Sequence, residues 1–321
     1  MADITVTKKT ELTVCIRGPC NYACEYCIGH NRKDPVLLHD LKKLEYWLSG
    51  IGGFIVSIFE CGSSEPTIHP QIKDLISLLT KYGQLTIPTN NSIDPAKYIP
   101  EDCISRVKLL AAFHTQSENH IDDYIARLLW VQQKGGIVSA SYIAYPPRIK
   151  KVDLYKQKFV DAGIYFSIIP FEGEYEGIVY PEGHTEEHKK IMGLSDGKDS
   201  SWYRRLSLDA TIRNFENIPC LAGYTKILID GEGYLRRCLY DHVPIEQPFN
   251  EAKPCTVSYC GCGMYLKELN TQTPRYWNQY LRQCNLSIEE IDKTEDQMYA
   301  ENYIKYWELM SKYHKLRGLN K

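Results

Sequence analysis

Apolar runs and amphipathic stretches alternate along the first half of the chain. Short runs rich in β-branched and apolar residues recur, and each is followed by a stretch whose apolar positions fall at helical spacing. This alternation is typical of repeated β–α units that build a parallel sheet. The pattern predicts strands at 12–17, 54–60, 84–88, 106–113, 136–144 and 164–169. It predicts helices at 36–49, 70–82, 94–100, 118–134 and 150–161.

The pattern changes after residue 170. From 170 to about 215 the chain is rich in Pro, Gly, Tyr and acidic residues, which predicts a long irregular connection, either functional or a surface linker. The run from Ile227 to Leu235 predicts a hairpin with a glycine-rich turn. Aromatic and apolar residues at helical spacing from 288 to about 316 predict a helix that caps the core.

Composition narrows the class of protein. The 321 residues suggest about two domains, and 43% apolar residues, 24% charged residues and a net charge of −2 indicate a globular protein with no nucleic acid partner. No apolar run approaches the roughly 20 residues that cross a bilayer, so we expect no membrane partner. The first residues lack a basic segment followed by an apolar run, so we expect a cytoplasmic protein whose twelve cysteines are not secretory disulfides.

Three cysteines directly after the first predicted strand are the strongest chemical signal. Cys20, Cys24 and Cys27 are spaced C-x₃-C-x₂-C. Thiolates this close in sequence can converge on one iron–sulfur cluster, and a four-iron cluster with only three protein thiolates keeps one iron open for an outside ligand. Half of a structural zinc site, or chance, is the alternative, although a four-thiolate zinc site normally shows a second nearby C-x₂-C pair.

Polar residues also follow the later strands. The stretch from Glu60 to Pro66 surrounds Glu65 with small residues, and a carboxylate held in such a loop can receive an ammonium group. Asn90 ends the third strand, and His114 with Thr115 ends the fourth. An ordinary turn or a loop-capping role is the alternative for each of them.

Together these motifs resemble the signatures of the radical S-adenosylmethionine (radical SAM) enzymes. Ser63-Ser64-Glu65-Pro66 resembles the GGEP motif of that family, with serines in place of the commoner glycines. The resemblance implies a partial (β/α)₆ TIM-like barrel and a [4Fe–4S] cluster that binds SAM at its open iron. Its chemistry is cleavage of SAM to a 5′-deoxyadenosyl radical, which abstracts hydrogen from an unactivated C–H bond. The implied cluster ligands are Cys20, Cys24 and Cys27, and the implied SAM-binding residues are Tyr26, Ser63, Ser64, Glu65, Asn90, His114 and Thr115.

A second group of cysteines lies in the last third of the chain. Cys220 and Cys238 flank the predicted hairpin as C-x₁₂-G-x₄-C, which is similar to the opening of SPASM and Twitch auxiliary-cluster domains. The resemblance implies one auxiliary [4Fe–4S] cluster, and a zinc ribbon is the alternative because the ligand chemistry is the same. Its implied ligands come from Cys220, Cys238, Cys255, Cys260 and Cys262, and which of the last three is spare stays open. The expected domains are a barrel at 1–215, a Twitch-like domain at 216–287 and a capping helix at 288–321.

The reaction that follows hydrogen abstraction is less defined. We expect a small polar biosynthetic substrate, such as a sugar, aminoglycoside or nucleotide-sugar, that is epimerised or dehydrogenated. The alternative is a ribosomally made precursor peptide that gains a thioether, a carbon–carbon bond or a D-residue, and a further one is a non-catalytic iron–sulfur or zinc protein. Cys61, at a strand end, is a candidate hydrogen donor, or else a small buried hydrophobe. The expected electron donor is a flavodoxin-like or ferredoxin-like one-electron reductase.

Overall fold

The chain forms two compact units in the computed structural model. The structure describes residues 10–16, 18–27, 40–51, 54–60, 64–180, 183–192, 219–220, 222–223, 226–230, 233–238, 241, 243–249 and 253–256. The first unit draws on Met1–Cys15, His39–Ile58 and Asp199–Tyr313, and the second on Ile16–Leu38, Phe59–Lys198 and His314–Lys321.

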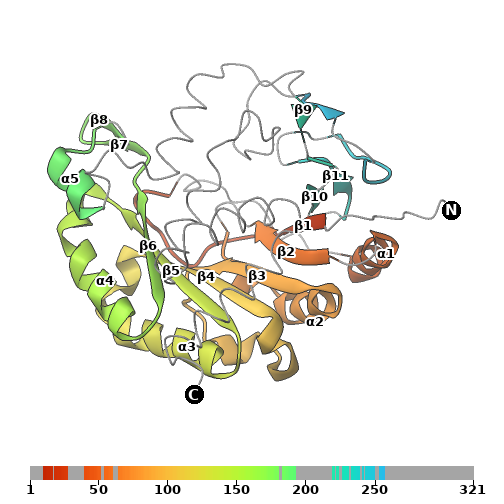
Figure 1. Ribbon diagram of the computed structural model, residues 1–321, viewed down its shortest axis with the longest axis horizontal. Coiled ribbons are helices and arrows are strands. Elements are labelled where there is room, and N and C mark those ends of the chain that lie inside the picture. The colour runs from red at the N-terminus through yellow and green to blue at the C-terminus, as the bar shows by residue number, and fades with distance from the viewer. Residues whose placement is uncertain are drawn as a thin grey trace, which may run out of the picture. The chain divides into compact units, whose positions relative to one another are not determined.

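The second unit is built on four parallel strands in sequence order, which are β3 (Gln84–Thr89), β4 (Val107–Phe113), β5 (Ile137–Ala144) and β6 (Tyr165–Pro170). The helices between them are α2 (Ile72–Tyr82), α3 (Ile121–Gln133) and α4 (Val152–Asp161). All three helices lie along one face of this sheet (Figure 1). This is the repeated β–α arrangement that the sequence predicts, and it is consistent with a partial barrel.

A cluster of buried aromatic side chains packs α3 and α4 against the sheet. Phe113 at the end of β4 is buried and meets Tyr124 of α3 and Tyr155 of α4 edge-on, with ring centroids 5.1 Å apart in each pair. Phe159 of α4 joins the same cluster at 5.4 Å. Burial of each aromatic side chain contributes roughly 1.5–3 kcal/mol, so this cluster fixes α3 and α4 on the sheet.

Short 3₁₀ turns occupy the loops around these strands. They are η1 (Pro66–Ile68), η2 (Pro95–Lys97), η3 (Glu101–Arg106), η4 (Thr115–His120) and η5 (Pro146–Lys151). The helix predicted at 94–100 is only the single turn η2, and the helix predicted at 118–134 is divided into η4 and α3. Proline at the first position of η2 sets its start, and the Asp94 side chain caps it.

The connection after β6 is more regular than the sequence indicates. Strands β7 (Gly173–Tyr175) and β8 (Ile178–Tyr180) form an antiparallel hairpin, and helix α5 (Glu186–Ile191) follows. Glu176 and Gly177 make the turn with φ values of 51° and 75°. Two central residues with positive φ are typical of a type I′ hairpin turn. The sequence does not predict this hairpin, because Glu rarely occupies the first central position of such a turn, where Asn or Asp is usual.

The first unit contains β1 (Thr10–Cys15), α1 (Leu41–Ile51), most of β2 (Phe54–Glu60), β9 (Pro219–Cys220), β10 (Lys226–Ile229), β11 (Leu235–Arg236) and β12 (Lys253–Pro254). The predicted hairpin is present as the antiparallel pair β10 and β11. Strand β10 also pairs in parallel with β1, with Leu12 opposite Ile227. The sequence pattern gives no sign of that long-range pairing.

Helix α1 is attached to the β10–β11 hairpin. The Asp40 side chain caps the helix by accepting the Lys42 and Lys43 amides at 3.0 and 3.1 Å. Trp47 donates its indole N–H to the Gly233 carbonyl at 3.2 Å, and the Lys43 ammonium lies 3.8 Å from the Tyr234 ring centroid. Gly233 has a φ of 79°, a conformation that glycine adopts without strain.

All six predicted strands are therefore present, each with its ends close to the expected residues. The predicted helix at 288–316 and the predicted domain boundaries at 215 and 287 lie outside the described residues and stay predictions. Within the part of the chain that the structure describes, no helix combines the length and apolar character needed to span a bilayer.

Candidate functional site

Several loops of the second unit meet at the carboxyl ends of its strands. Parallel strands that end at one edge of a sheet bring the loops after them together. The segments that follow β3 and β4 here contact the cysteine loop at 18–27 and the loop that begins at Ser64. This edge of the sheet is therefore the candidate site.

The cysteine loop presents its three thiols in different environments. Cys24 is buried, Cys27 is partly buried and Cys20 is exposed. The Cys27 amide donates to the Cys24 carbonyl at 3.0 Å, which closes a turn. The Tyr22 amide donates to the Cys20 sulfur at 3.4 Å, and the Cys24 thiol donates to Gln116 Oε1 at 3.3 Å. The loop is thus held by its own backbone and by the segment after β4.

The three thiols share one electrostatic environment. Although Cys20 is exposed as a whole residue, partial desolvation of its sulfur by the surrounding atoms raises the pKa of the thiol, and nearby Glu65 and Cys27 raise it further. Burial raises the pKa of Cys24 to about 11, with added repulsion from Cys27 and Cys20. Neighbouring thiolates therefore oppose ionisation of Cys20 and Cys24, and a bound cation would reverse this effect because metal ligation requires and stabilises the thiolate.

The donor set fits an iron–sulfur cluster by its chemistry. Three cysteine thiols on one short loop, close enough to influence one another's ionisation, are the ligands that such clusters use. Across the described ranges, however, no three His, Cys, Asp or Glu side chains converge as an assembled metal site. A protonated thiol is neutral and can hydrogen-bond to a neighbouring side chain, as Cys24 does with Gln116. Ligation by Cys20, Cys24 and Cys27 remains a prediction.

Glu65 is a buried hydrogen-bond centre. Its side chain Oε1 accepts from the Thr67 amide at 3.1 Å, the Thr67 hydroxyl at 2.5 Å and the Thr89 hydroxyl at 2.7 Å. Its Oε2 accepts from the Asn90 amide at 2.6 Å. The residue is only 3% exposed. The carboxylate thus joins η1 to the end of β3, and Oε2 keeps lone-pair capacity for one more donor.

Asn90 and the Ser64–Glu65 backbone tie this centre to the cysteine loop. The Asn90 side-chain amide donates to Asn21 Oδ1 at 2.9 Å and lies 3.8 Å from the Cys20 sulfur. The Glu65 amide donates to the Pro19 carbonyl at 3.1 Å, and the Ser64 hydroxyl donates to the Ile16 carbonyl at 3.2 Å. Two motifs far apart in the sequence are therefore one hydrogen-bonded assembly.

An aromatic group borders the same loop. The Tyr26 hydroxyl lies 2.8 Å from His114 Nδ1, and the two rings stack with centroids 5.9 Å apart. Burial lowers the pKa of His114 to about 4 and raises the pKa of Tyr26 far above its usual value. At neutral pH the imidazole is therefore uncharged, and it shares a hydrogen bond with the phenol. Tyr145, directly after β5, packs on Tyr26 at 5.0 Å and donates to Glu25 at 3.2 Å.

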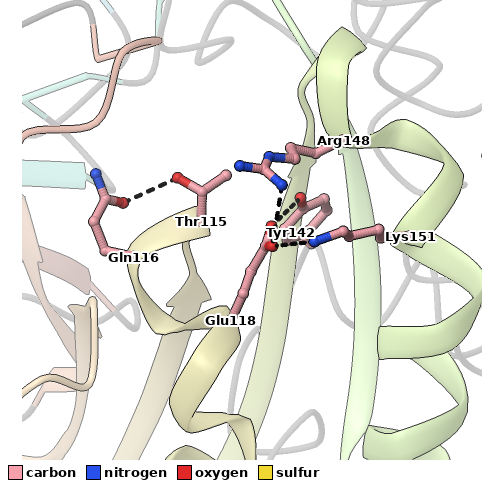
Figure 2. A network of polar contacts seen from close by, with 6 residues as sticks. All are labelled: Thr115, Gln116, Glu118, Tyr142, Arg148 and Lys151. Carbon is pink, nitrogen blue, oxygen red and sulfur yellow. Dashed lines mark hydrogen bonds and ion pairs between the residues drawn. The ribbon is translucent and has the colours of Figure 1, made fainter.

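A charged network anchors the segment after β4. Figure 2 shows Glu118 of η4 reaching toward residues of β5 and η5. Its carboxylate accepts from the Tyr142 hydroxyl at 3.3 Å and from the Lys151 ammonium at 2.8 Å, and Arg148 lies 3.8 Å away. The Glu118 side chain is only 8% exposed. This network fixes the turn that carries Gln116, the partner of Cys24.

The structure brings most of the predicted site residues together. Cys20, Cys24, Tyr26, Ser64, Glu65, Asn90 and His114 are linked to one another or to the cysteine loop. The Thr115 hydroxyl donates to Gln116 Oε1 (Figure 2), and the Thr115 backbone hydrogen-bonds with Tyr26 of the cysteine loop. Cys61 and Ser63 lie outside the described residues. Gln116 continues the polar stretch that the sequence marks at His114 and Thr115, whereas Tyr145 was not singled out, although it too follows a predicted strand end.

The second cysteine group lies in the first unit. Cys220 belongs to β9, and Cys238 and Cys255 follow β11 and β12. Cys260 and Cys262 lie outside the described residues. Of the five cysteines predicted to hold a cluster or zinc ion, the structure thus describes Cys220, Cys238 and Cys255, and the metal site stays a prediction.

Comparisons with known proteins give a likeness of fold. No family model and no curated protein matches the sequence. Streptococcus suis SuiB bound to S-adenosylmethionine is similar at 14% identity and a TM-score of 0.50, over 74% of this chain and 63% of that chain. SuiB bound to the precursor peptide SuiA is similar at 14% identity and a TM-score of 0.50, over 76% and 64%.

A histidine-tagged form of anSMEcpe with bound AdoMet is similar at 13% identity and a TM-score of 0.50. That match covers 96% of this chain and 97% of the other, whereas the chain spans less than two thirds of SuiB. The chain therefore has the α/β fold of proteins that bind S-adenosylmethionine, as the sequence predicts.

Proposed function

We propose that this chain, whose fold is shared with these S-adenosylmethionine-bound proteins, is a radical SAM enzyme. The observation that carries the proposal is the assembly of Cys20, Cys24 and Cys27 with Glu65 and Asn90 at one edge of the sheet. The cysteine motif and the Ser63–Pro66 motif are separate in the sequence, yet the loops that carry them share hydrogen bonds.

The cluster would be held by the three thiols of the cysteine loop. When bound, a [4Fe–4S] cluster with SAM at its open iron supplies the electron that cleaves SAM to methionine and the 5′-deoxyadenosyl radical. The electron would come from a flavodoxin-like or ferredoxin-like reductase. The chain's own task is to orient SAM and to keep solvent away from the radical.

The described residues suit that task. The stacked pair of Tyr26 and His114 offers a flat, uncharged surface beside the cysteine loop, which suits an adenine ring. Glu65 Oε2 can accept the methionyl ammonium alongside the Asn90 amide. The hydroxyls of Ser64 and Thr115 and the amide of Asn90 supply further polar groups for the ribose and the carboxylate.

A small polar substrate remains our first candidate. Along β5 and β6 the buried positions alternate with the half-buried residues Ser139, Ser141 and Ser167, and Ser141 lies opposite Ser167 in the sheet. Hydroxyls on the less buried side of the strands suit a substrate with many hydrogen-bonding groups, such as a sugar, an aminoglycoside or a nucleotide-sugar. Epimerisation or dehydrogenation is the expected outcome, with Cys61 as candidate hydrogen donor for epimerisation and the auxiliary cluster as electron acceptor for dehydrogenation.

A precursor peptide is the second candidate. It is favoured by the likeness in fold to SuiB, which has been seen bound to the precursor peptide SuiA. Modification of a peptide would use the same cluster and the same hydrogen abstraction, so the two candidates differ only in what occupies the substrate site.

The proposed function is tested by anaerobic reconstitution with iron and sulfide. With a strong reductant, the protein should convert SAM to 5′-deoxyadenosine, and Cys24→Ser should abolish this. Cys103→Ser is the matched control, because Cys103 is also buried but lies outside the cysteine loop, where it accepts a hydrogen bond from Thr80. Zinc in place of iron, or equal activity of Cys24→Ser and wild type, would refute the proposal. Transfer of deuterium into 5′-deoxyadenosine from a labelled sugar or from a labelled peptide then identifies the substrate class.

A further inference from the structure

One buried arginine joins three cysteine-bearing segments of the first unit, those of Cys220, Cys238 and Cys255. Arg237 directly precedes Cys238 and is only 4% exposed. Its guanidinium donates to the carbonyl of Ala222 at 3.2 Å, of Lys253 at 2.6 Å and of Pro254 at 2.5 Å. A guanidinium is a planar fork of five N–H donors, so a single side chain can satisfy carbonyls from several segments at once.

The three carbonyls belong to the segments that carry the other two cysteines. Ala222 lies two residues after Cys220, and Pro254 directly precedes Cys255. Strand β9 pairs with β12 in a register that sets Cys220 opposite Lys253. Backbone pairing and the arginine together therefore bring the segments of Cys220, Cys238 and Cys255 to one place.

A second link joins Cys238 to the Cys255 segment. The Asp241 amide donates to the Cys238 sulfur at 3.3 Å. The Asp241 carboxylate accepts from the hydroxyl of Thr256, the residue after Cys255, at 2.6 Å. Amide donors to sulfur are among the groups that stabilise cysteine thiolates on iron–sulfur clusters.

Arg237 is itself held in place. Its guanidinium carbon lies 5.7 Å from the ring centroid of Phe249, whose amide donates to the Gly223 carbonyl at 2.7 Å. Gly223 has a φ of 85°, and a Cβ there would lie 2.7 Å from the Phe249 ring and 3.1 Å from Arg237 Cγ. Glycine at this position is therefore required for Phe249 and Arg237 to pack as they do.

We propose that Arg237 is the positioning residue of the auxiliary cluster site, and that Cys255 is a ligand together with Cys220 and Cys238. The spare thiol is then Cys260 or Cys262. This inference rests on the proposed function, since the auxiliary cluster accompanies the SAM-cleaving cluster. Three carbonyls bound by one fixed cation hold the ligand segments together before metal arrives, which favours cluster assembly.

The test isolates the auxiliary site in a chain that lacks the first cluster. In a variant with Cys20, Cys24 and Cys27 changed to alanine, anaerobic reconstitution should leave about four irons per chain. Adding Arg237→Gln should reduce this below about one iron, because a shorter, neutral amide with two N–H donors cannot bind all three carbonyls. Adding Arg236→Gln, the matched control, should leave the iron count unchanged, since Arg236 pairs with Asp230 instead.

Two further variants separate positioning from general folding. Gly223→Ala removes no thiol, carbonyl or guanidinium group but displaces Phe249 and Arg237, so it should lose the auxiliary iron as Arg237→Gln does. Arg237→Lys keeps the charge but lacks the fork, so it should retain part of the iron with an altered electron paramagnetic resonance signal. In the full chain Arg237→Gln should lower iron from about eight to about four per chain, whereas a misfolded protein would lose both clusters.

Several outcomes would overturn the inference. It fails if Arg237→Gln keeps the auxiliary iron with an unchanged signal, or if Cys255→Ser keeps it while Cys260→Ser or Cys262→Ser does not. It also fails if the chain without the first three cysteines binds no iron. Production of 5′-deoxyadenosine by the wild-type protein is measured separately, so failure of this inference is distinct from failure of the proposed function.

Discussion

Replacement of Glu65 by glutamine tests whether this carboxylate organises the site. The carboxylate accepts four hydrogen bonds, three at Oε1 and one at Oε2, while almost fully buried. In Glu65→Gln the amide nitrogen replaces one oxygen, so one buried donor loses its acceptor and the other bonds lose the assistance of the charge. With hydrogen bonds to charged groups worth about 1.5–3 kcal/mol, we expect a loss of about 3 kcal/mol.

Hydrogen exchange measures this loss where it arises. The Asn90 amide is a direct donor to Glu65, so exchange of the peptide that covers the end of β3 and Asn90 should accelerate about a hundredfold, the equivalent of about 3 kcal/mol. Glu101→Gln is the matched control, because Glu101 forms an exposed ion pair with Lys134 at 3.3 Å, and it should change exchange by less than about threefold. Equal exchange in the two variants would show that Glu65 is not the centre of the assembly.

Three further predictions concern the same edge of the sheet. Because burial lowers the pKa of His114 from 6.5 to about 4, its neutral form contributes stability that is fully present above pH 6.5 and is lost as the pH falls toward 4. Urea unfolding of His114→Gln should therefore show a shallower acid decline than wild type, and parallel curves would contradict this. Because the Cys24 pKa is about 11, iodoacetamide at pH 8 should modify this thiol about a hundredfold more slowly than an ordinary cysteine, and an ordinary rate would contradict the burial. Glu118→Gln should weaken SAM binding about tenfold in calorimetry by loosening η4, whereas Asp122→Asn, which breaks an exposed ion pair between α3 and α4, should not; equal affinities would refute that role.

The sequence predicts the strands well because their signal is local. Alternation of buried and less buried residues in β4 and β5 is visible in the residue types, and the loops that follow carry the polar residues of the site. The β7–β8 hairpin is not predicted from the sequence, because its turn depends on the positive φ of Glu176, which no sequence rule marks. The pairing of β10 with β1 is not predicted either, because the register between distant segments is set by packing of the whole unit.

The site is predicted in its residue types but not in its connections. The spacing of Cys20, Cys24 and Cys27 indicates a metal, and the carboxylate at Glu65 indicates a ligand for an ammonium group. In the structure Glu65 also accepts hydrogen bonds from two threonine hydroxyls and a backbone amide. These bonds depend on how η1 packs against β3, which the sequence does not reveal. Arg237 belongs to no motif, since its importance comes from partners that lie near it only after folding.

Electron paramagnetic resonance of the reduced, reconstituted protein tests the central claim most directly. With Cys220 and Cys238 changed to alanine, the remaining signal reports the cluster on Cys20, Cys24 and Cys27 alone. A SAM ligand on an open iron should change this signal, and Cys20→Ala should remove it. The account would be contradicted by a signal that SAM does not change, or by a signal that remains in Cys20→Ala. Either result would mean that the cluster is not held by three thiols with one iron left open for SAM.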